Sequence, residues 1–108
     1  MKIAVIGDGG WGTANALLLA DYGHDVTLWG AFPDYIEEMR RTRRNEKFLK
    51  GVELPANLNL TADRAEAVKG AEVVVLAPPS KYFTSVVSGF KGLVTPDMLV
   101  VSITKGLC

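Results

Sequence analysis

The chain has 108 residues, 48% of them apolar, and its 12 basic residues balance 12 acidic ones to a formal net charge of zero. This composition predicts one folded domain and excludes a disordered tail, and the lack of a basic excess argues against a nucleic-acid partner. One cysteine, Cys108, and one histidine, His24, predict neither a disulfide framework nor a metal site. With no apolar run of roughly 18 to 20 residues and no signal-peptide pattern, we expect no membrane span and a cytoplasmic protein.

Short apolar runs alternate with helical patterns along the chain. The expected strands cover residues 3–6, 26–29, 58–60, 73–76 and 98–103. The expected helices cover residues 13–22, 33 to about 44, a short one capped by Thr61 or Asp63 and reaching Val68, and one from Ser80 to about Val87. Residues 45–57 are expected to form an ordered loop.

This alternation predicts an α/β fold of the Rossmann type, which is a doubly wound parallel sheet with helices on both faces. The expected strand order is 3-2-1-4-5, in one domain that covers residues 1–108. The order reverses between the first and fourth strands, and ligands are expected beyond the carboxyl ends of those strands.

A glycine-rich loop joins the first strand to the first helix. Gly7, Gly9 and Gly12 have the spacing G-x-G-x-x-G, and its place between a strand and a helix makes the signal specific for a dinucleotide. Gly7 permits a tight turn, Gly9 lets a pyrophosphate approach the backbone, and Gly12 lets the helix pack on the strand. The amides of Gly10, Trp11 and Gly12 would form an anion site at the helix N-terminus. The alternative is that these glycines only form a tight turn between the strand and the helix and bind no ligand.

The end of the second strand lacks the usual reader of the cofactor ribose. Trp29, Gly30 and Ala31 stand where an acidic residue selects NAD or an arginine accommodates NADP, so the sequence leaves NAD and NADP both open. Phe32 either stacks on the adenine or packs into the core. Asp8, inside the glycine loop, would repel a pyrophosphate by about 1 kcal/mol if solvated at about 4 Å. We expect weaker cofactor binding than with alanine there, unless the side chain points away and accepts a backbone hydrogen bond.

Four motifs in order resemble the N-terminal half of the NAD(P)-dependent glycerol-3-phosphate dehydrogenase family, over essentially the whole chain. They are residues 1–7 leading into Gly10-Trp11-Gly12-Thr13-Ala14; Val26-Thr27-Leu28-Trp29; Asn45, Phe48-Leu49, Gly51, Leu54-Pro55 and Asn57-Leu58; and Thr104-Lys105-Gly106. Gly10, Ala31, Lys50, Pro78, Lys81 and Arg43 depart from the family's common residues, which leaves cofactor preference open.

The resemblance implies hydride transfer between NAD(P)H and dihydroxyacetone phosphate, which gives glycerol 3-phosphate. It places Lys105 beside the nicotinamide and in contact with the phosphorylated substrate, which agrees with a cation at the carboxyl end of a strand. The expected cofactor-binding residues are Gly7, Gly9, Gly10, Trp11, Gly12, Phe32, Phe48, Pro79 and Lys105. The family's proton-donating lysine belongs to a C-terminal helical substrate domain that is expected to be absent, so we expect cofactor binding without turnover and no catalytic residue in this chain.

Several alternatives remain open from the sequence. The chain could belong to another dehydrogenase with a helical second domain, such as a ketopantoate reductase or hydroxyisobutyrate dehydrogenase, or act as a stand-alone nucleotide-sensing module. Six basic residues lie between Arg40 and Lys50 against Glu46 alone, and they either cap a helix and face solvent or attract an anionic ligand. Self-association is expected through apolar surface at the far end of the sheet and around Leu107.

Overall fold

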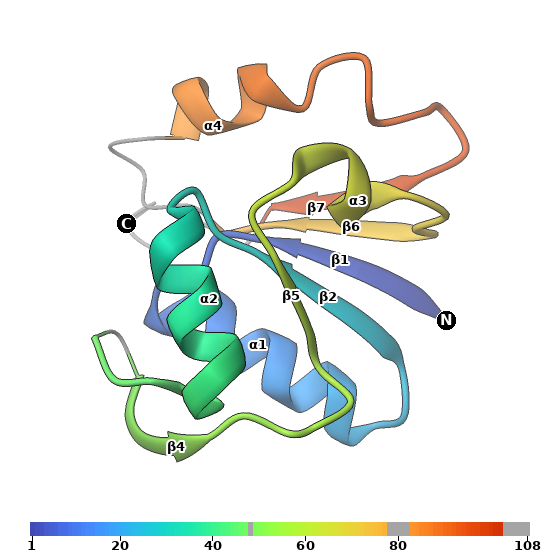
Figure 1. Ribbon diagram of the computed structural model, residues 1–108. Helices are drawn as coiled ribbons and strands as arrows, with labels where there is room; N and C mark the ends of the chain where they lie inside the picture. Colours follow the sequence, from blue (N-terminus) through green and yellow to red (C-terminus); the bar gives the residue numbers. More distant parts are fainter. Residues whose placement is uncertain (48, 78–82, 103–108) are drawn as a thin grey trace, which may run out of the picture.

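The protein, described here by a computed structural model over residues 1–47, 49–77 and 83–102, is built on a five-stranded parallel sheet (Figure 1). The strands are β1 (Lys2–Ile6), β2 (Asp25–Trp29), β5 (Asn59–Thr61), β6 (Val73–Leu76) and β7 (Leu99–Ser102). Their spatial order is β5-β2-β1-β6-β7. Numbered along the chain within this sheet, the order is 3-2-1-4-5, which confirms the predicted Rossmann-type topology.

Helices cover both faces of the sheet. α1 (Gly10–Asp21) and α2 (Pro33–Thr42) lie on one face, and α3 (Arg64–Val68) and α4 (Phe83–Gly89) lie on the other (Figure 1). α1 begins earlier than predicted because Gly9 takes an extended conformation as its N-cap. α2 ends earlier than predicted because Arg43 adopts a left-handed φ of 56°.

The core consists of two apolar layers that follow from strand alternation, since successive side chains of a strand point to opposite faces. Ile3 and Val5 of β1 pack toward α1 and α2, with Leu28 of β2. Ala4 and Ile6 pack toward α3 and α4. The central strands are buried on both faces, as the continuous apolar runs predict.

The segment between α2 and β5 differs from its predicted loop conformation. It contains a separate antiparallel pair, β3 (Arg44–Asn45) and β4 (Leu49–Glu53). All of β4 is at least partly exposed, so the pair has no alternating apolar face by which the sequence could signal it. Backbone pairing of Arg44 with Glu53 holds the two strands together, and the Leu54 N–H donates to the Arg43 carbonyl at 2.6 Å.

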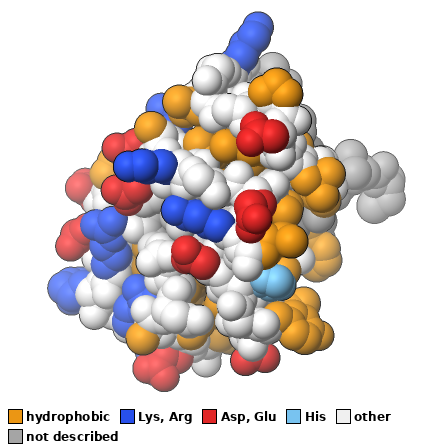
Figure 2. Space-filling model, turned by 90° about the vertical axis from the view of Figure 1, so that its right-hand side faces the viewer, with side chains coloured by type: hydrophobic (Ala, Val, Ile, Leu, Met, Phe, Trp, Pro, Cys, Tyr) orange, Lys and Arg blue, Asp and Glu red, His pale blue; other side chains and the backbone are white. Residues whose placement is uncertain are grey.

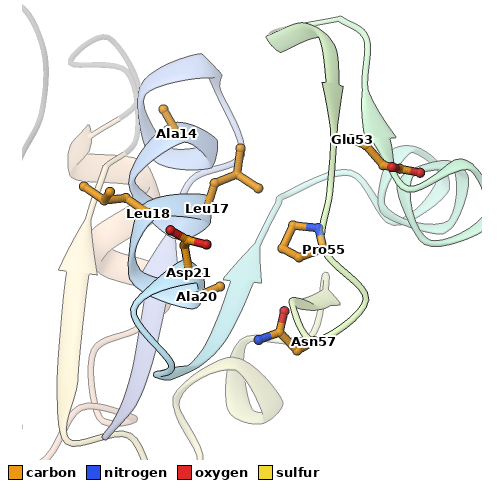
Figure 3. Close-up of a pocket in the computed structure, with 8 residues that line it drawn as sticks. All are labelled: Ala14, Leu17, Leu18, Ala20, Asp21, Glu53, Pro55 and Asn57. Carbon is orange, nitrogen blue, oxygen red and sulfur yellow. The ribbon is translucent and has the colours of Figure 1, made fainter.

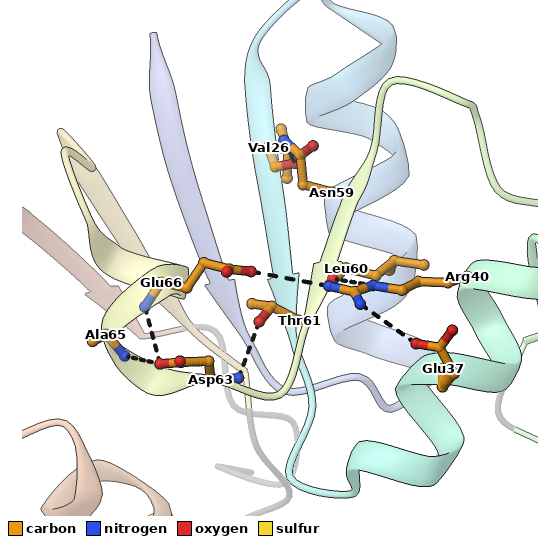
Figure 4. Close-up of polar contacts among 9 residues, drawn as sticks. All are labelled: Val26, Glu37, Arg40, Asn59, Leu60, Thr61, Asp63, Ala65 and Glu66. Atoms are coloured by element: carbon orange, nitrogen blue, oxygen red, sulfur yellow. Dashed lines mark hydrogen bonds and ion pairs between the residues drawn. The ribbon is translucent and has the colours of Figure 1, made fainter.

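Two of the six basic residues between Arg40 and Lys50 make structural contacts at the end of α2. Arg40 donates to the carbonyl of Leu60 at 2.9 Å and forms ion pairs with Glu37 at 3.4 Å and Glu66 at 4.0 Å, so it joins α2 to β5 and α3 (Figure 4). Arg43 donates to the carbonyls of Leu58, at 2.8 Å, and Pro55. These two cations therefore connect α2 to neighbouring segments, and their part-buried contacts differ from the solvent-facing position expected from the sequence.

Asp63 provides the N-cap of α3. Its carboxylate accepts hydrogen bonds from the backbone N–H groups of Ala65 at 2.9 Å and Glu66 at 3.2 Å (Figure 4). This geometry confirms Asp63, of the two predicted candidates, as the cap. Ser80, the predicted cap of α4, lies outside the described residues.

The surface carries charges of both signs. On the face shown in Figure 2, acidic and basic side chains are interspersed among apolar ones. None of the helices in the described part of the chain combines the length and apolar character needed to span a membrane.

Candidate functional site

The turn from β1 into α1 lies at the carboxyl end of the sheet, beside the point where the strand order reverses. Gly7 follows β1 with φ of 123°, a left-handed conformation that favours glycine. Its N–H donates to the carbonyl of Trp29, at the end of β2, at 2.9 Å. On the other side of β1, the N–H of Ala77 donates to the carbonyl of Ile6 at 2.8 Å. The turn is therefore held against both neighbouring strands.

Gly12 is dictated by close packing. A Cβ at this position would lie 2.1 Å from the Gly7 carbonyl oxygen and 3.3 Å from Cβ of Ala77. The first approach is far shorter than any real contact, and it involves backbone that cannot move aside cheaply. Only glycine lets the first turn of α1 pack against the ends of β1 and β6, as the motif predicts.

Gly9 is different, because it faces open space. A Cβ there would meet no other atom within 4 Å, and the φ of −65° is accessible to any residue. Folding therefore does not require glycine at this position. The first intrahelical hydrogen bond runs from the Thr13 N–H to the Gly9 carbonyl at 2.9 Å, so the N–H groups of the preceding turn lie at the end of a 12-residue helix. Such an end attracts anions.

A buried network of hydrogen bonds holds the backbone of the glycine loop in place. The Asn45 amide donates to the Asp8 carbonyl at 2.7 Å and to the Thr13 hydroxyl at 2.8 Å, and the Thr13 hydroxyl donates to the same carbonyl at 3.0 Å. The Tyr35 hydroxyl donates to the Asn45 side-chain oxygen. Asn45 and Thr13 are fully buried. Sequence reasoning missed this network, although Asn45 belongs to the motif that carries the family resemblance.

The Asp8 side chain extends toward the end of β2. A Cβ added at Gly30 would lie 2.3 Å from Oδ2 of Asp8, 2.7 Å from its Cγ and 2.8 Å from Cδ1 of Ile36. Oδ2 is buried, and no donor among the described residues forms a hydrogen bond to it. Burial raises the pKa of the Asp8 carboxyl, while a backbone hydrogen bond at Asp8 and the Lys47 ammonium act in the opposite direction.

Tyr35 couples the network to the hairpin. Its hydroxyl accepts a hydrogen bond from the Lys47 N–H at 3.1 Å, and the Lys47 ammonium lies 5.9 Å from the centre of its ring. Burial raises the pKa of the Tyr35 hydroxyl, and the Lys47 N–H partly offsets that rise. The phenol is therefore a neutral donor, which suits its hydrogen bond to Asn45.

Two aromatic side chains near the loop are exposed. Phe32, the N-cap of α2, is 68% exposed, so the alternative that it packs into the core is wrong. Trp11, in the first turn of α1, is 52% exposed. Both aromatic surfaces are thus accessible to a ligand at this edge. Three other predicted cofactor residues, Phe48, Pro79 and Lys105, lie outside the described residues.

An open groove of about 640 Å³ lies apart from the glycine loop. Side chains of α1 form one wall, and the end of β4 with the segment that follows it forms the other (Figure 3). Its lining residues are Ala14, Leu17, Leu18, Ala20, Asp21, Glu53, Pro55 and Asn57. None of the predicted site residues is among them, and the two carboxylates make it unsuited to an anionic cofactor.

The glycine loop fits a dinucleotide on three observations. The open space at Gly9 admits a pyrophosphate to the backbone, the clash at Gly12 explains the third glycine, and the partly exposed Asp8 places a carboxyl group beside the loop as an acceptor. Among the described residues, no group of three His, Cys, Asp or Glu side chains is placed to hold a metal ion.

Comparison with known proteins gives a consistent result. Residues 2–108 match the profile of the family described as NAD-dependent glycerol-3-phosphate dehydrogenase N-terminus. The chain is 44% identical to a glycerol-3-phosphate dehydrogenase (NAD(P)+) of Streptomyces avermitilis and 46% identical to that of Geobacter metallireducens, over 99% and 98% of its length. It superposes on the crystal structure of glycerol-3-phosphate dehydrogenase from Coxiella burnetii with a TM-score of 0.91 and 33% identity, over 99% of this chain.

The match covers only part of each relative. The chain spans 32% of the two bacterial sequences and 33% of the crystallised protein. Because the family profile matches nearly every residue, the alternative of another dehydrogenase family is excluded. The chain therefore belongs to the NAD(P)-dependent glycerol-3-phosphate dehydrogenase family and corresponds to its N-terminal, dinucleotide-binding part.

Proposed function

We propose that residues 1–108 form one dinucleotide-binding domain that holds NAD(H) or NADP(H) at the loop from Gly7 to Gly12. In this proposal the pyrophosphate lies over Gly9 at the N-terminus of α1, and the amides of Gly10, Trp11 and Gly12 face it. Phe32 offers its exposed ring to the adenine, and Phe48 and Pro79 complete the set of contacts.

The observation that carries the proposal is the contrast between two glycines of the loop. Gly12 is needed by the fold, because a Cβ there would meet the Gly7 carbonyl oxygen at 2.1 Å. Gly9 is not needed by the fold, because a Cβ there would meet nothing within 4 Å. Gly9 lies at the N-terminus of α1, and packing does not require a glycine there. Close approach of a ligand to the backbone explains why the residue is glycine.

The reaction in which we propose the domain takes part is hydride transfer between the nicotinamide ring and the pair dihydroxyacetone phosphate and glycerol 3-phosphate. The bound cofactor would supply or accept the hydride. The contribution of this chain is to fix the cofactor and, through Lys105, to place a cation near the phosphate or carbonyl of the substrate.

Isothermal calorimetry of the 108-residue chain with NADH and with NADPH tests the binding. We expect the unmodified chain to bind at least one of them. Gly9→Ala should weaken binding at least tenfold while the chain stays folded, because its methyl group enters space that the fold leaves open and only the N-cap preference is lost. Tyr22→Ala, an exposed position at the other end of α1, is the matched control and should bind normally. Failure of the unmodified chain to bind either cofactor would refute the proposal.

We also propose that this chain alone does not catalyse turnover. The chain has one histidine, His24, which precedes β2. It therefore lies at the amino ends of the strands, whereas the glycine loop lies at their carboxyl ends. An assay of NADH oxidation with dihydroxyacetone phosphate should show no enzymatic rate above the rate without protein. A robust rate would show that the catalytic groups are present in this chain, and it would leave the binding proposal intact.

We further propose that the chain self-associates through the edge strand β7. Leu99, Val100 and Val101 are 62%, 45% and 37% exposed, and one side of β7 has no strand paired to it among the described residues. Light scattering should show concentration-dependent dimers that Leu99→Lys abolishes. A chain that stays monomeric at millimolar concentration contradicts the idea.

A further inference from the structure

The chain lacks an acidic side chain at the position that usually reads the ribose of the cofactor. In Rossmann folds, a carboxylate at the end of the second strand accepts hydrogen bonds from the ribose hydroxyls of NAD. The residue that follows β2 here is Gly30, and its N–H donates to the Thr61 carbonyl at 3.1 Å, which continues the sheet by one residue. The next residue is Ala31. The carboxyl end of β2 therefore supplies no carboxylate.

A carboxylate nevertheless lies at this place, delivered from the glycine loop. The space that a side chain at position 30 would enter is filled by the carboxyl group of Asp8, with Oδ2 at 2.3 Å and Cγ at 2.7 Å from the Cβ position. The Asp8 carboxyl and a side chain on residue 30 are thus mutually exclusive. This relationship explains why glycine follows β2 when the loop carries aspartate.

The Asp8 carboxyl also has an unused acceptor. Oδ2 is buried and has no hydrogen-bond partner among the described residues, although a buried carboxylate oxygen without a donor is costly. The cation that acts on it electrostatically is Lys47, which favours the ionised form, and Tyr35 is the other titratable group coupled to it. Asp8 as a residue is only partly buried, so a sugar hydroxyl would approach its carboxyl group from the exposed side and supply the missing donor there.

We propose that Asp8 replaces the missing strand-end carboxylate, accepts a hydrogen bond from the adenosine ribose, and selects NAD(H) over NADP(H). The inference rests on the proposed binding of a dinucleotide at the glycine loop. A 2′-phosphate at that ribose would bring a second anion against the carboxylate, in a site that gives no compensating cation from the end of β2. The expectation from the sequence, that Asp8 weakens cofactor binding, assumed a carboxylate facing the pyrophosphate. With the carboxyl over Gly30, the opposite follows for NADH.

Calorimetric affinities for NADH and NADPH, measured on the 108-residue chain and three variants, test this inference. The unmodified chain should bind NADH more tightly than NADPH. Asp8→Asn keeps the shape and removes the charge, and it should lower the NADH-to-NADPH affinity ratio roughly tenfold or more. The double variant Asp8→Ala/Gly30→Asp moves the carboxylate to the strand-end position and should restore the preference for NADH. Asp21→Asn, at the exposed end of α1, is the matched control and should leave the ratio unchanged.

The outcomes separate this inference from the proposed function. If both cofactors bind and Asp8→Asn leaves their ratio unchanged, the role of Asp8 is refuted and dinucleotide binding stands. A chain that prefers NADPH also refutes the role of Asp8. If neither cofactor binds the unmodified chain, the proposed function and this inference fall together.

Discussion

The side-chain amide of Asn45 donates a hydrogen bond of 2.7 Å to the backbone carbonyl of Asp8, across 37 positions of sequence. The contact ties strand β3 to the middle of the glycine loop. Thr13, in α1, is the second acceptor of the same amide at 2.8 Å. Three segments that meet only in the folded chain are thus fixed by one fully buried side chain.

Replacing Asn45 should loosen the loop. Asn45→Ala leaves the Asp8 carbonyl, the Thr13 hydroxyl and the Tyr35 hydroxyl short of a buried partner, and we expect a loss of about 2 to 3 kcal/mol in the free energy of unfolding. Urea unfolding measures it. Asn59→Ala, which removes an exposed hydrogen bond to Asp25 and a part-buried one to the Val26 carbonyl, is the control and should cost less than about 1 kcal/mol. Equal losses in the two variants would contradict the special role of Asn45.

Gly12→Ala should be strongly destabilising, because the new methyl group meets the Gly7 carbonyl oxygen at 2.1 Å. We expect a loss of about 3 kcal/mol, at the upper end of the range for overpacked sites. Gly9→Ala, with nothing within 4 Å of the new atom, should cost at most about 1 kcal/mol, because alanine is a poorer N-cap than glycine. Thermal unfolding of both variants makes the comparison. If Gly12→Ala did not lower the stability, the close packing of α1 against the end of β1 would be contradicted.

Asp8 should give stability a specific dependence on pH. Because burial raises the pKa of its carboxyl in the folded state, the folded chain binds this proton more tightly than the unfolded chain. Protonation on acidification therefore favours folding, and this contribution is lost as pH rises through the folded-state pKa. Asp8→Asn cannot titrate, so its stability advantage over the unmodified chain should be largest near neutral pH and should shrink toward pH 4. Urea unfolding of both proteins across this range checks the sign, and an advantage that grows on acidification would contradict it.

Asp63→Ala should cost about 1 kcal/mol, because the carboxylate caps two N–H groups of the short helix α3. Asp63→Asn and Asp63→Ser preserve an N-cap acceptor and should recover most of the loss. Chemical denaturation of the three variants tests the assignment. A serine variant as unstable as the alanine variant would mean that the carboxylate acts through its charge instead of its capping geometry.

The parallel sheet could be predicted from the sequence because most of the segments whose composition favours a strand are also the segments that the fold buries. Four strands of the parallel sheet contain an apolar run, whereas β5 (Asn59–Thr61) has a single apolar residue, Leu60. The glycine spacing identifies the turn at the end of β1. The β3–β4 pair was missed because its strands are short and polar, with no apolar periodicity. α2 ends at Thr42 because Arg43 adopts a left-handed conformation. This conformation is uncommon for an arginine, and no local sequence pattern predicts it.

The candidate site was predicted less fully, since its polar contacts are long-range. The glycines could be assigned from spacing, but the burial of Asn45 depends on a hairpin that the pattern did not reveal. The direction of the Asp8 side chain depends on the absence of a side chain at Gly30, which follows β2 and is 22 positions away in the sequence. Phe32 could equally have packed inside, and only the placement of α2 relative to the sheet leaves it exposed.

Backbone NMR of the 15N-labelled chain during an NADH titration locates the bound cofactor residue by residue. We expect the largest amide shift changes on Gly9, Gly10, Trp11 and Gly12, with a second group at Gly30 and Ala31. We expect small changes at Leu17, Asp21 and Asn57, which line the separate groove. Shift changes concentrated in that groove, or none at all with NADH at millimolar concentration, would contradict cofactor binding at the glycine loop.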